Sequence, residues 1–481
     1  MAAGLSRPAG SLDVDSALLP YRKPLDQRTA AHLLRRAGFG GSAAEIAHFA
    51  TMSPAFAAET LVHFPDTSAL PQPDDVYDAA ADVFALRGVD PTTRRQTLMD
   101  LRKRMRASIL SMQQWWLNRM LLTPAPLQEK MTLFFHGHFT TAAIQKGAWP
   151  SYIYAQNQLF RENALGNLRA LTLAVSKDPA MLLYLDNASN TKVHPNENYA
   201  RELMELFTLG HGNYTESDIR ESARAFTGWT VNRLMGSFTV NSRTHDDDSK
   251  TFLGQTGNFD GSDIVDIIYR QPACSRFWAQ SLLNAFVYND PEPALVDATA
   301  GLIQKNHFNL APVMTTLLQS NVFYSERAYR ALVKSPTEFI VGTYKAFGLT
   351  QMQPSALRAM SQMGQILFYP PNVAGWPGGE NWMTSQTLIA RQNFVAALVN
   401  SPMMSNMNWL EEAATDAPSA SRMLVDRLLQ SDAPHQAYEQ LVSYLNGKDT
   451  SALGTFSNEN FEERVRGAAY LTMAMPAYQL S

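Results

Sequence analysis

Helical segments that begin at capping signals recur along the whole chain, and this pattern most constrains the fold. Several start where serine or aspartate precedes proline, as at Asp90-Pro91 and Ser335-Pro336. Proline suits the first helical turn, because the N–H that it lacks would have no partner there. Apolar residues recur every three to four positions, as in Leu203, Leu206 and Phe207, which is the spacing of one helix face. The sequence therefore predicts a mainly α, multi-helical globular fold.

One segment departs from this pattern. Between residues 236 and 260, Phe238, Val240 and Ser242 alternate, and Thr256-Gly257-Asn258 supplies turn residues. Alternation with a period of two is typical of a strand. We expect a short β-hairpin or an extended segment near 236–260.

The distribution of polar and helical segments suggests three parts. Residues 1–22 have the composition of a disordered N-terminal arm. We expect a main α-helical domain over 23–410, which with 45% hydrophobic residues in the chain has ample material for a core. Residues 411–481 should form a C-terminal helical pair packed on that domain.

Composition excludes several classes of protein. A net charge of −4 offers no basic field for nucleic acid, and no apolar run reaches the length of a transmembrane segment. The single cysteine, Cys274, excludes an intramolecular disulfide and a site with several thiolates. No signal peptide begins the sequence, so we expect a cytoplasmic protein, although an exported form with its signal removed would look the same.

Charge is most concentrated between His194 and Trp229, where 36 residues hold two histidines, six carboxylates and three arginines. We expect one helix over Asn196–Leu209 and a second that opens at Thr215 with a capping box. On the first helix Glu197 and Arg201 are four residues apart and can pair across one turn.

Glu202 and Glu205 are three residues apart on the same expected helix, so their carboxylates share a face. They could act as the acid and base of a hydrolase, because glycoside cleavage uses two nearby carboxylates. They could also bind a metal, or form a structural network with Arg201, Arg220 and Arg224.

Imidazoles occur beside carboxylates at two further places. His136 and His138 flank a glycine at a helix end and could ligate zinc, manganese or iron, the remaining ligands coming from Glu202, Glu205, His194 or His245 with Asp246. Alternatively, the two histidines cap a buried helix end. His245 and Asp246 could form a base with its orienting carboxylate, or the aspartates of this segment could hold a divalent cation or simply be solvated.

Three tryptophans lie near glycines: Trp229, Trp376 and Trp382. Such a set could stack against a sugar ring or an aromatic ligand, whereas packing in the core is the commoner fate of tryptophan. The segment 368–382 is too apolar for a free linker, so we expect it to pack over the helices.

Six sequence motifs together resemble one family, the bacterial domain of unknown function 1800. They are His32-Leu-Leu-Arg-Arg-Ala-Gly-Phe-Gly40, Phe135-His-Gly-His-Phe139, Asn196-Glu-Asn-Tyr-Ala-Arg-Glu-Leu-Met-Glu-Leu-Phe-Thr-Leu-Gly210, Ala223-Arg-Ala-Phe-Thr-Gly-Trp229, His245-Asp246 with Lys250-Thr-Phe-Leu-Gly254, and Asn372-Val-Ala-Gly-Trp-Pro-Gly-Gly379. The resemblance implies no activity. It implies a sulfatase-like partner encoded nearby and, in many members, an export signal. It also groups the polar motif residues in one site: His136, His138, Arg201, Glu202, Glu205, His245 and Asp246.

These observations support two hypotheses. The first is a metal-assisted, hydrolase-like enzyme for a small-molecule, glycan or polymer-derived substrate, in which Arg201 and Arg224 orient the carboxylates and Trp229, Trp376 and Trp382 wall the pocket. The alternative is a non-catalytic helical scaffold that binds a protein partner or a glycan. In that case the charged residues form salt bridges between helices, and the tryptophan-glycine loop is the contact surface.

Overall fold

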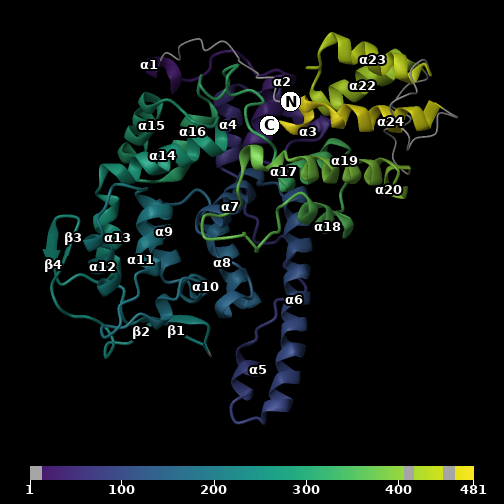
Figure 1. Ribbon diagram of the computed structural model, residues 1–481. Coiled ribbons are helices and arrows are strands. Elements are labelled where there is room, and N and C mark those ends of the chain that lie inside the picture. Colours follow the sequence, from purple (N-terminus) through teal and green to yellow (C-terminus); the bar gives the residue numbers. More distant parts are fainter. Residues whose placement is uncertain (1–13, 234, 406–415, 448–460) are drawn as a thin grey trace.

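The computed structural model describes residues 14–233, 235–405, 416–447 and 461–481 (Figure 1). Helices dominate these ranges, and their strands form two antiparallel pairs: β1 (Trp229–Asn232) with β2 (Ser237–Val240), and β3 (Lys250–Phe252) with β4 (Gln255–Gly257). The mainly α fold with hairpins near 236–260 is therefore confirmed.

The N-terminal helices include residues that the sequence assigned to a disordered arm. They are α1 (Val14–Ala17), α2 (Gln27–Arg36), α3 (Ala43–Phe49) and α4 (Pro54–Val62). Residues 1–13 lie outside the described ranges, but residues 14–22 differ from the expectation. Tyr21 N donates to Gln319 O at 2.8 Å, Val322 N donates to Ala17 O at 2.9 Å, and Ala17 is buried. Backbone pairing with the middle of the chain fixes this segment.

A long helical hairpin extends from the body of the molecule (Figure 1). It consists of α5 (Ala80–Ala85) and α6 (Pro91–Leu122). Asp90 caps α6 by accepting hydrogen bonds from Thr92 N and Thr93 N at 3.0 Å each, with Pro91 in the first turn. The capping signal read from the sequence therefore fixes where this helix starts.

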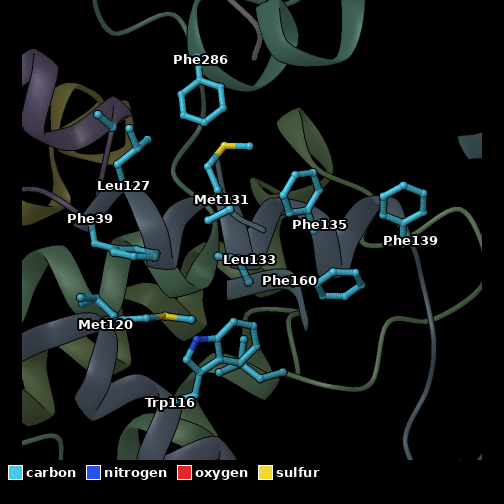
Figure 2. Close-up of a cluster of buried hydrophobic side chains, with 14 of the residues drawn as sticks. Phe39, Trp116, Met120, Leu127, Met131, Leu133, Phe135, Phe139, Phe160 and Phe286 are labelled. Atoms are coloured by element: carbon cyan, nitrogen blue, oxygen red, sulfur yellow. The ribbon is translucent and has the colours of Figure 1, made fainter. Parts of the chain in front are cut away.

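The helix α7 (Pro126–His138) lies at the centre of the core, and most of its residues are buried. In Figure 2, side chains from several elements surround it, including Phe39, Trp116, Phe160 and Phe286. A helix that is buried on nearly every side cannot be amphipathic, because it has no broad solvent face. Its residues therefore meet α6, α8 (Pro150–Glu162) and α14 (Pro272–Phe286) at the same time.

One buried carboxylate ties α6, α7 and α8 together. Glu129, fully buried on α7, accepts from Arg119 Nε at 2.6 Å, Arg161 Nε at 2.7 Å and Trp116 Nε1 at 2.8 Å. Burial opposes ionisation, but Arg161 and then Arg119 hold the pKa of Glu129 below its usual value. This cluster orients α7 within the core.

The middle of the chain forms a group of shorter helices beside the two β-hairpins. They are α9 (Leu168–Ser176), α10 (Pro179–Tyr184), α11 (Asn198–Glu202), α12 (Glu216–Ala225), α13 (Gly261–Tyr269), α15 (Pro293–Lys305) and α16 (Leu310–Leu318). In Figure 1 these helices lie on the opposite side of α7 from the C-terminal helices.

The C-terminal part contains α17 (Pro336–Ala346), α18 (Ser355–Gln362), α19 (Ser385–Val399), α20 (Pro402–Ser405), α22 (Ala417–Leu429), α23 (His435–Leu445), α24 (Phe461–Ala474) and α25 (Pro476–Gln479). The expected boundary at 410/411 lies outside the described residues. Beyond it, where we expected a pair of helices, the structure has α22, α23, α24 and α25, and α24 packs on α19. None of the helices in the described ranges combines the length and apolarity needed to cross a bilayer.

Candidate functional site

The segment with the highest charge density folds as two helices joined by a short loop, and the first of them ends in a π-helical turn. The expected helix over Asn196–Leu209 forms as α11 followed by a π-helical turn, Leu203–Thr208. The next helix, α12, is capped by Thr215, whose hydroxyl accepts from Asp218 N at 3.2 Å while Asp218 accepts from Thr215 N at 2.8 Å. The capping box read from the sequence is therefore present.

An arginine–carboxylate network exists here; among the described residues it includes the expected pair of Glu197 and Arg201 but neither Glu202 nor Glu205. Arg201 binds Glu216 with two hydrogen bonds of 2.9 Å and lies 3.3 Å from Glu197. Arg224 binds Asp246 at 2.8 and 3.2 Å, and Glu221 at 2.9 Å. Both guanidinium groups are occupied by these carboxylates, which corrects the expectation that they pair with or orient Glu202 and Glu205.

Glu202 and Glu205 have different surroundings. Glu205 accepts from Tyr214 Oη at 2.9 Å and lies 3.1 Å from His211 Nε2. Glu202 is half-buried and has no hydrogen bond or ion pair with the described residues. Burial, followed by the charge of Glu205, raises the pKa of Glu202. The two carboxyl groups thus differ in their hydrogen-bond partners.

His245 and Asp246 do not form a base with its orienting carboxylate. His245 Nδ1 lies 2.7 Å from Thr227 O, and Asp246 faces Arg224 instead of the imidazole. Lys250 donates to Asp246 O at 2.6 Å and to Asp248 O at 2.9 Å. This cluster closes the loop that follows β2 against α12, which is a structural arrangement.

His136 lies in the hydrophobic core. Its Nε2 is 3.0 Å from Asn157 Nδ2, and its ring centre lies 4.9 Å from that of Trp116 and 4.8 Å from that of Phe160. Burial, followed by the charge of Arg161, lowers the pKa of His136 to about 3.

The residues expected to share a metal therefore lie in separate surroundings. Among the residues that the structure describes, no group of three or more His, Cys, Asp or Glu side chains is placed to hold a metal ion. His136 bonds to Asn157, whereas His245 bonds to a backbone carbonyl. Within the described ranges these side chains therefore do not converge as the three or more ligands of a divalent cation would.

Trp229 also differs from the expectation, because it belongs to the core. It is 2% exposed, and its ring makes edge contacts with Phe226 and Phe238 at centroid distances of 5.1 and 4.9 Å. Trp229 is therefore unavailable for stacking on a ligand.

Trp376 and Trp382, in contrast, line a cavity of about 370 Å³, which we call the tryptophan pocket. One wall is a stripe along α7 at helical spacing: Lys130, Leu133, Phe134, Gly137 and His138. The opposite walls come from α14, from the start of α17 and from the loop that carries the tryptophans, and they include Ser281, Asn284, Ala285, Phe286, Asn289, Leu332, Val333, Ser335, Glu338, Gln365, Gly378 and Gly379. The volume falls within the range of small-molecule sites.

Two glycines allow the tryptophan loop to dock on α7. A Cβ at Gly375, which has φ +87°, would lie 2.2 Å from Gly137 O, and a Cβ at Gly137 would lie 3.6 Å from the Trp376 ring. The loop backbone thus touches the helix end, and the Trp376 ring lies over Gly137. The glycine of the His136-Gly137-His138 sequence serves this contact.

His138 lines the pocket, and one hydrogen bond fixes its tautomer. Its Nε2 lies 2.9 Å from Phe207 O, which can only accept, so Nε2 carries the proton. Burial lowers the pKa of His138 to about 4, although the bond to Phe207 opposes this shift. The imidazole is consequently neutral at pH 7, and Nδ1 is an acceptor.

Several residues of the lining carry a donor that has no acceptor among the described residues. The indole nitrogens of Trp376 and Trp382 are shielded from solvent, and neither donates to an acceptor among the described residues. Gln365 is 2% exposed, and its oxygen accepts from Thr337 N at 3.0 Å and from Thr337 Oγ1 at 2.8 Å. Its amide nitrogen has no hydrogen bond with the described chain.

The formally charged residues of the lining form one ion pair, which sequence reasoning missed. Lys130 binds Glu338, and Lys130 Nζ also donates to Gly38 O at 3.1 Å. Burial opposes the ionisation of Glu338, but Lys130 keeps its pKa below the usual value. These two residues are 208 positions apart, so no local spacing could have paired them.

Comparison with known proteins identifies the family alone. No curated protein and no solved structure matches the sequence convincingly. The model of a family described as "Protein of unknown function (DUF1800)" matches residues 32–480, nearly the whole chain. The chain therefore belongs to this DUF1800 family.

Proposed function

We propose that this protein is a helical scaffold that binds a neutral saccharide, or another ring with several hydroxyl groups, in the tryptophan pocket. The observation that carries the proposal is the composition of the walls: two tryptophans, a neutral imidazole, and amide and hydroxyl side chains around about 370 Å³. Sugar rings are bound by stacking on aromatic faces, together with hydrogen bonds to their hydroxyl groups.

The electrostatics of the pocket favour a ligand without net charge. Lys130 and Glu338 neutralise each other, and His138 is neutral at pH 7. An anionic or cationic ligand would therefore lose hydration without gaining a free partner of opposite charge. Hydroxyl groups, in contrast, can both accept from amide donors and donate to His138 Nδ1.

The two indole N–H groups add a second argument. A shielded donor without an acceptor costs about 1–3 kcal/mol, and two of them lie on the same loop. Because both nitrogens are covered, we expect the loop 376–382 to shift slightly when a ligand hydroxyl becomes their acceptor.

The proposal is tested by isothermal titration calorimetry with three neutral probes: maltotriose, cellotriose and chitotriose. We expect at least one to bind, and Trp376→Ala and Trp382→Ala to weaken that binding at least tenfold. Phe56→Ala, an exposed aromatic residue outside the pocket (61% exposed), is the matched control and should leave binding unchanged. Failure of all three probes, or equal binding by the tryptophan variants, would contradict the proposal.

Hydrolysis by Glu202 and Glu205 is a second candidate function. It rests on the raised pKa of half-buried Glu202 beside Glu205, which Tyr214 and His211 hold. Glycoside cleavage uses two nearby carboxyl groups, and a raised pKa favours the acid role for Glu202. Release of reducing ends from the same three probes, abolished by Glu202→Gln, would support this function. If the wild type releases none, hydrolysis of these probes is refuted.

The metal-assisted version of hydrolysis needs ligands that the described residues do not gather. Elemental analysis of protein purified without chelator tests this version. Stoichiometric zinc, manganese or iron that disappears in a His136→Ala/His138→Ala variant would restore it.

A further inference from the structure

A second, much smaller cavity lies on the other side of the segment 332–335 from the tryptophan pocket. Its volume is about 30 Å³, and it lies between α2, α17, α22 and the last residues of the chain. Three cationic side chains line it: Arg35, Arg330 and Lys334. We call it the arginine cavity.

The lining of the arginine cavity contains no carboxylate. The nearest anionic partner is Asp432, whose carboxylate is 41% exposed and lies 3.2 Å from Arg330 Nη1. Lys334 is 8% exposed, and its Nζ donates to Tyr478 O at 2.7 Å. This acceptor is a neutral backbone carbonyl and not a carboxylate. The cavity is thus lined by two guanidinium groups and one amine, and the one carboxylate nearby, on Asp432, is solvent-exposed and bound to Arg330.

Arg35 carries the strongest evidence. It is 8% exposed, and its Nη1 donates to Gln430 Oε1 at 2.5 Å. Its Nε and Nη2 are shielded from solvent and have no well-oriented acceptor in the part of the chain that the structure describes, and the Tyr329 ring lies 5.7 Å from its Cζ. Buried guanidinium groups are normally paired, because an uncompensated charge is costly to remove from water.

The neighbouring residues reinforce this excess of positive charge. Arg36 is 1% exposed and donates to Ala328 O at 2.6 Å, while its Nε and Nη1 have no acceptor in the described chain. Burial, followed by Arg35, Arg330 and Arg391, lowers the pKa of Lys334 well below its ordinary value. Glu338, the nearest buried carboxylate, is bonded to Lys130.

The walls set the size of what can enter. A Cβ at Gly342 would lie 2.8 Å from Phe39 O, so backbone closes one side directly. A cavity needs roughly 10–15 Å³ of free space for one water molecule, so 30 Å³ admits about two waters or one small ion. An organic ligand does not fit.

We propose that the arginine cavity binds one small inorganic anion, which Arg35, Arg330 and Lys334 hold and which links α2 to the segment 330–334 and to α22. The anion supplies the missing acceptor for Arg35 Nε and Nη2. Its source is a free ion, with chloride favoured, because the space of about two waters is small for the five heavy atoms of sulfate or phosphate. This site is independent of the tryptophan pocket and of any saccharide.

The test uses the full chain in sodium gluconate, whose anion is too large for the cavity. Chloride, sulfate and phosphate are titrated separately at constant ionic strength while the melting temperature is recorded. We expect at least one anion to give a saturating rise of roughly 2–4 °C. Arg35→Met should abolish this rise, and Arg94→Met, which removes an exposed arginine of α6, should keep it.

The melting temperature in gluconate alone gives an independent readout. Arg35→Met should melt at or above the wild-type temperature there, because it removes an unpaired buried charge. If Arg35→Met does not fold, Lys334→Met carries the same prediction for the anion response. The proposal is overturned if no anion gives a saturating rise in the wild type, or if the folded cavity variant responds as the wild type does.

Discussion

The two histidines beside Gly137 have different surroundings, because neighbouring side chains on a helix point in different directions. His136 faces Trp116 and Phe160 in the core, whereas His138 faces the tryptophan pocket and bonds to Phe207 O. Positions two apart on a helix point to nearly opposite sides. The same two-residue spacing that suggests a shared metal therefore places the imidazoles in different surroundings.

His136→Gln tests the core assignment at the level of one residue. At pH 7.5 we expect it to lower the free energy of unfolding by about 2–4 kcal/mol, because it disturbs a packed ring and its bond to Asn157. The pKa of His136 is about 3 in the folded state, against an ordinary value of 6.5 for an exposed imidazole. As the pH falls below 6.5 only the unfolded chain takes up this proton, so the wild type loses this contribution.

The difference in the free energy of unfolding between the wild type and His136→Gln should therefore shrink by about 2 kcal/mol from pH 6.5 to pH 5. Urea unfolding at pH 7.5, 6.5, 5.75 and 5 measures it. A difference that stays constant over this range would show that His136 is not held neutral by burial.

The two arginines of the charged segment should differ in their effect on stability. Arg224 is 24% exposed and binds Asp246, whose side chain is 11% exposed, whereas Arg201 is 36% exposed and binds Glu216, which is 66% exposed. We expect Arg224→Met to cost about 1–3 kcal/mol and Arg201→Met less than about 1 kcal/mol. Urea unfolding compares them. Equal losses would contradict the assignment of Arg224 and Asp246 as the structural pair.

At the scale of elements, helix starts could be predicted because their causes are local. Thr215 and Ser335 cap helices through groups within three residues, so the sequence contains the whole interaction. The π-helical turn Leu203–Thr208 could not be predicted, because its apolar spacing also fits an ordinary helix. Packing around Phe207 and Leu203, which are both buried, depends on distant elements.

The docking of the tryptophan loop on α7 gives a prediction for one element. Gly375 and Gly378 both have positive φ, but only a Cβ at Gly375 meets backbone, at 2.2 Å from Gly137 O. We expect Gly378→Ala to cost about 1 kcal/mol from backbone strain alone. Gly375→Ala should cost more and should also weaken saccharide binding, because it lifts Trp376 away from α7.

Thermal unfolding and calorimetry on the two alanine variants measure these effects. Gly378→Ala is the matched control for stability, since it carries the strain without the clash. If both variants lose the same stability, the contact between Gly375 and Gly137 does not hold the pocket wall.

At the scale of the molecule, a buried ion pair joins α7 to α17 on one side of the tryptophan pocket. Lys130 and Glu338 are 10% and 17% exposed. We expect Lys130→Met alone to cost about 3–5 kcal/mol, because it leaves Glu338 buried without its partner. The double variant Lys130→Met/Glu338→Gln should recover part of this loss. A double-mutant cycle measured in urea tests the coupling, and additive losses would contradict it.

Only some residues of the tryptophan pocket can be predicted from the sequence. His138, Trp376 and Trp382 could be nominated from residue type and neighbouring glycines. Their meeting could not be derived, because it depends on α7, α14 and the loop 376–382 packing together across about half of the chain. Lys130, Asn284 and Gln365 carried no local signal, and the spacing of Glu338 from Ser335 predicts only a capping box.

A saccharide bound in the tryptophan pocket would lie beside the indole N–H groups of Trp376 and Trp382. The chain has eight tryptophans, and Trp376→Phe and Trp382→Phe assign two of their signals in a spectrum of ¹⁵N-indole-labelled protein. On titration with the saccharide probe that binds best, we predict that these two signals shift together and saturate, while those of buried Trp116, Trp229 and Trp278 stay in place. Saturating shifts confined to the other tryptophans, or no shift at any probe concentration, would contradict the account.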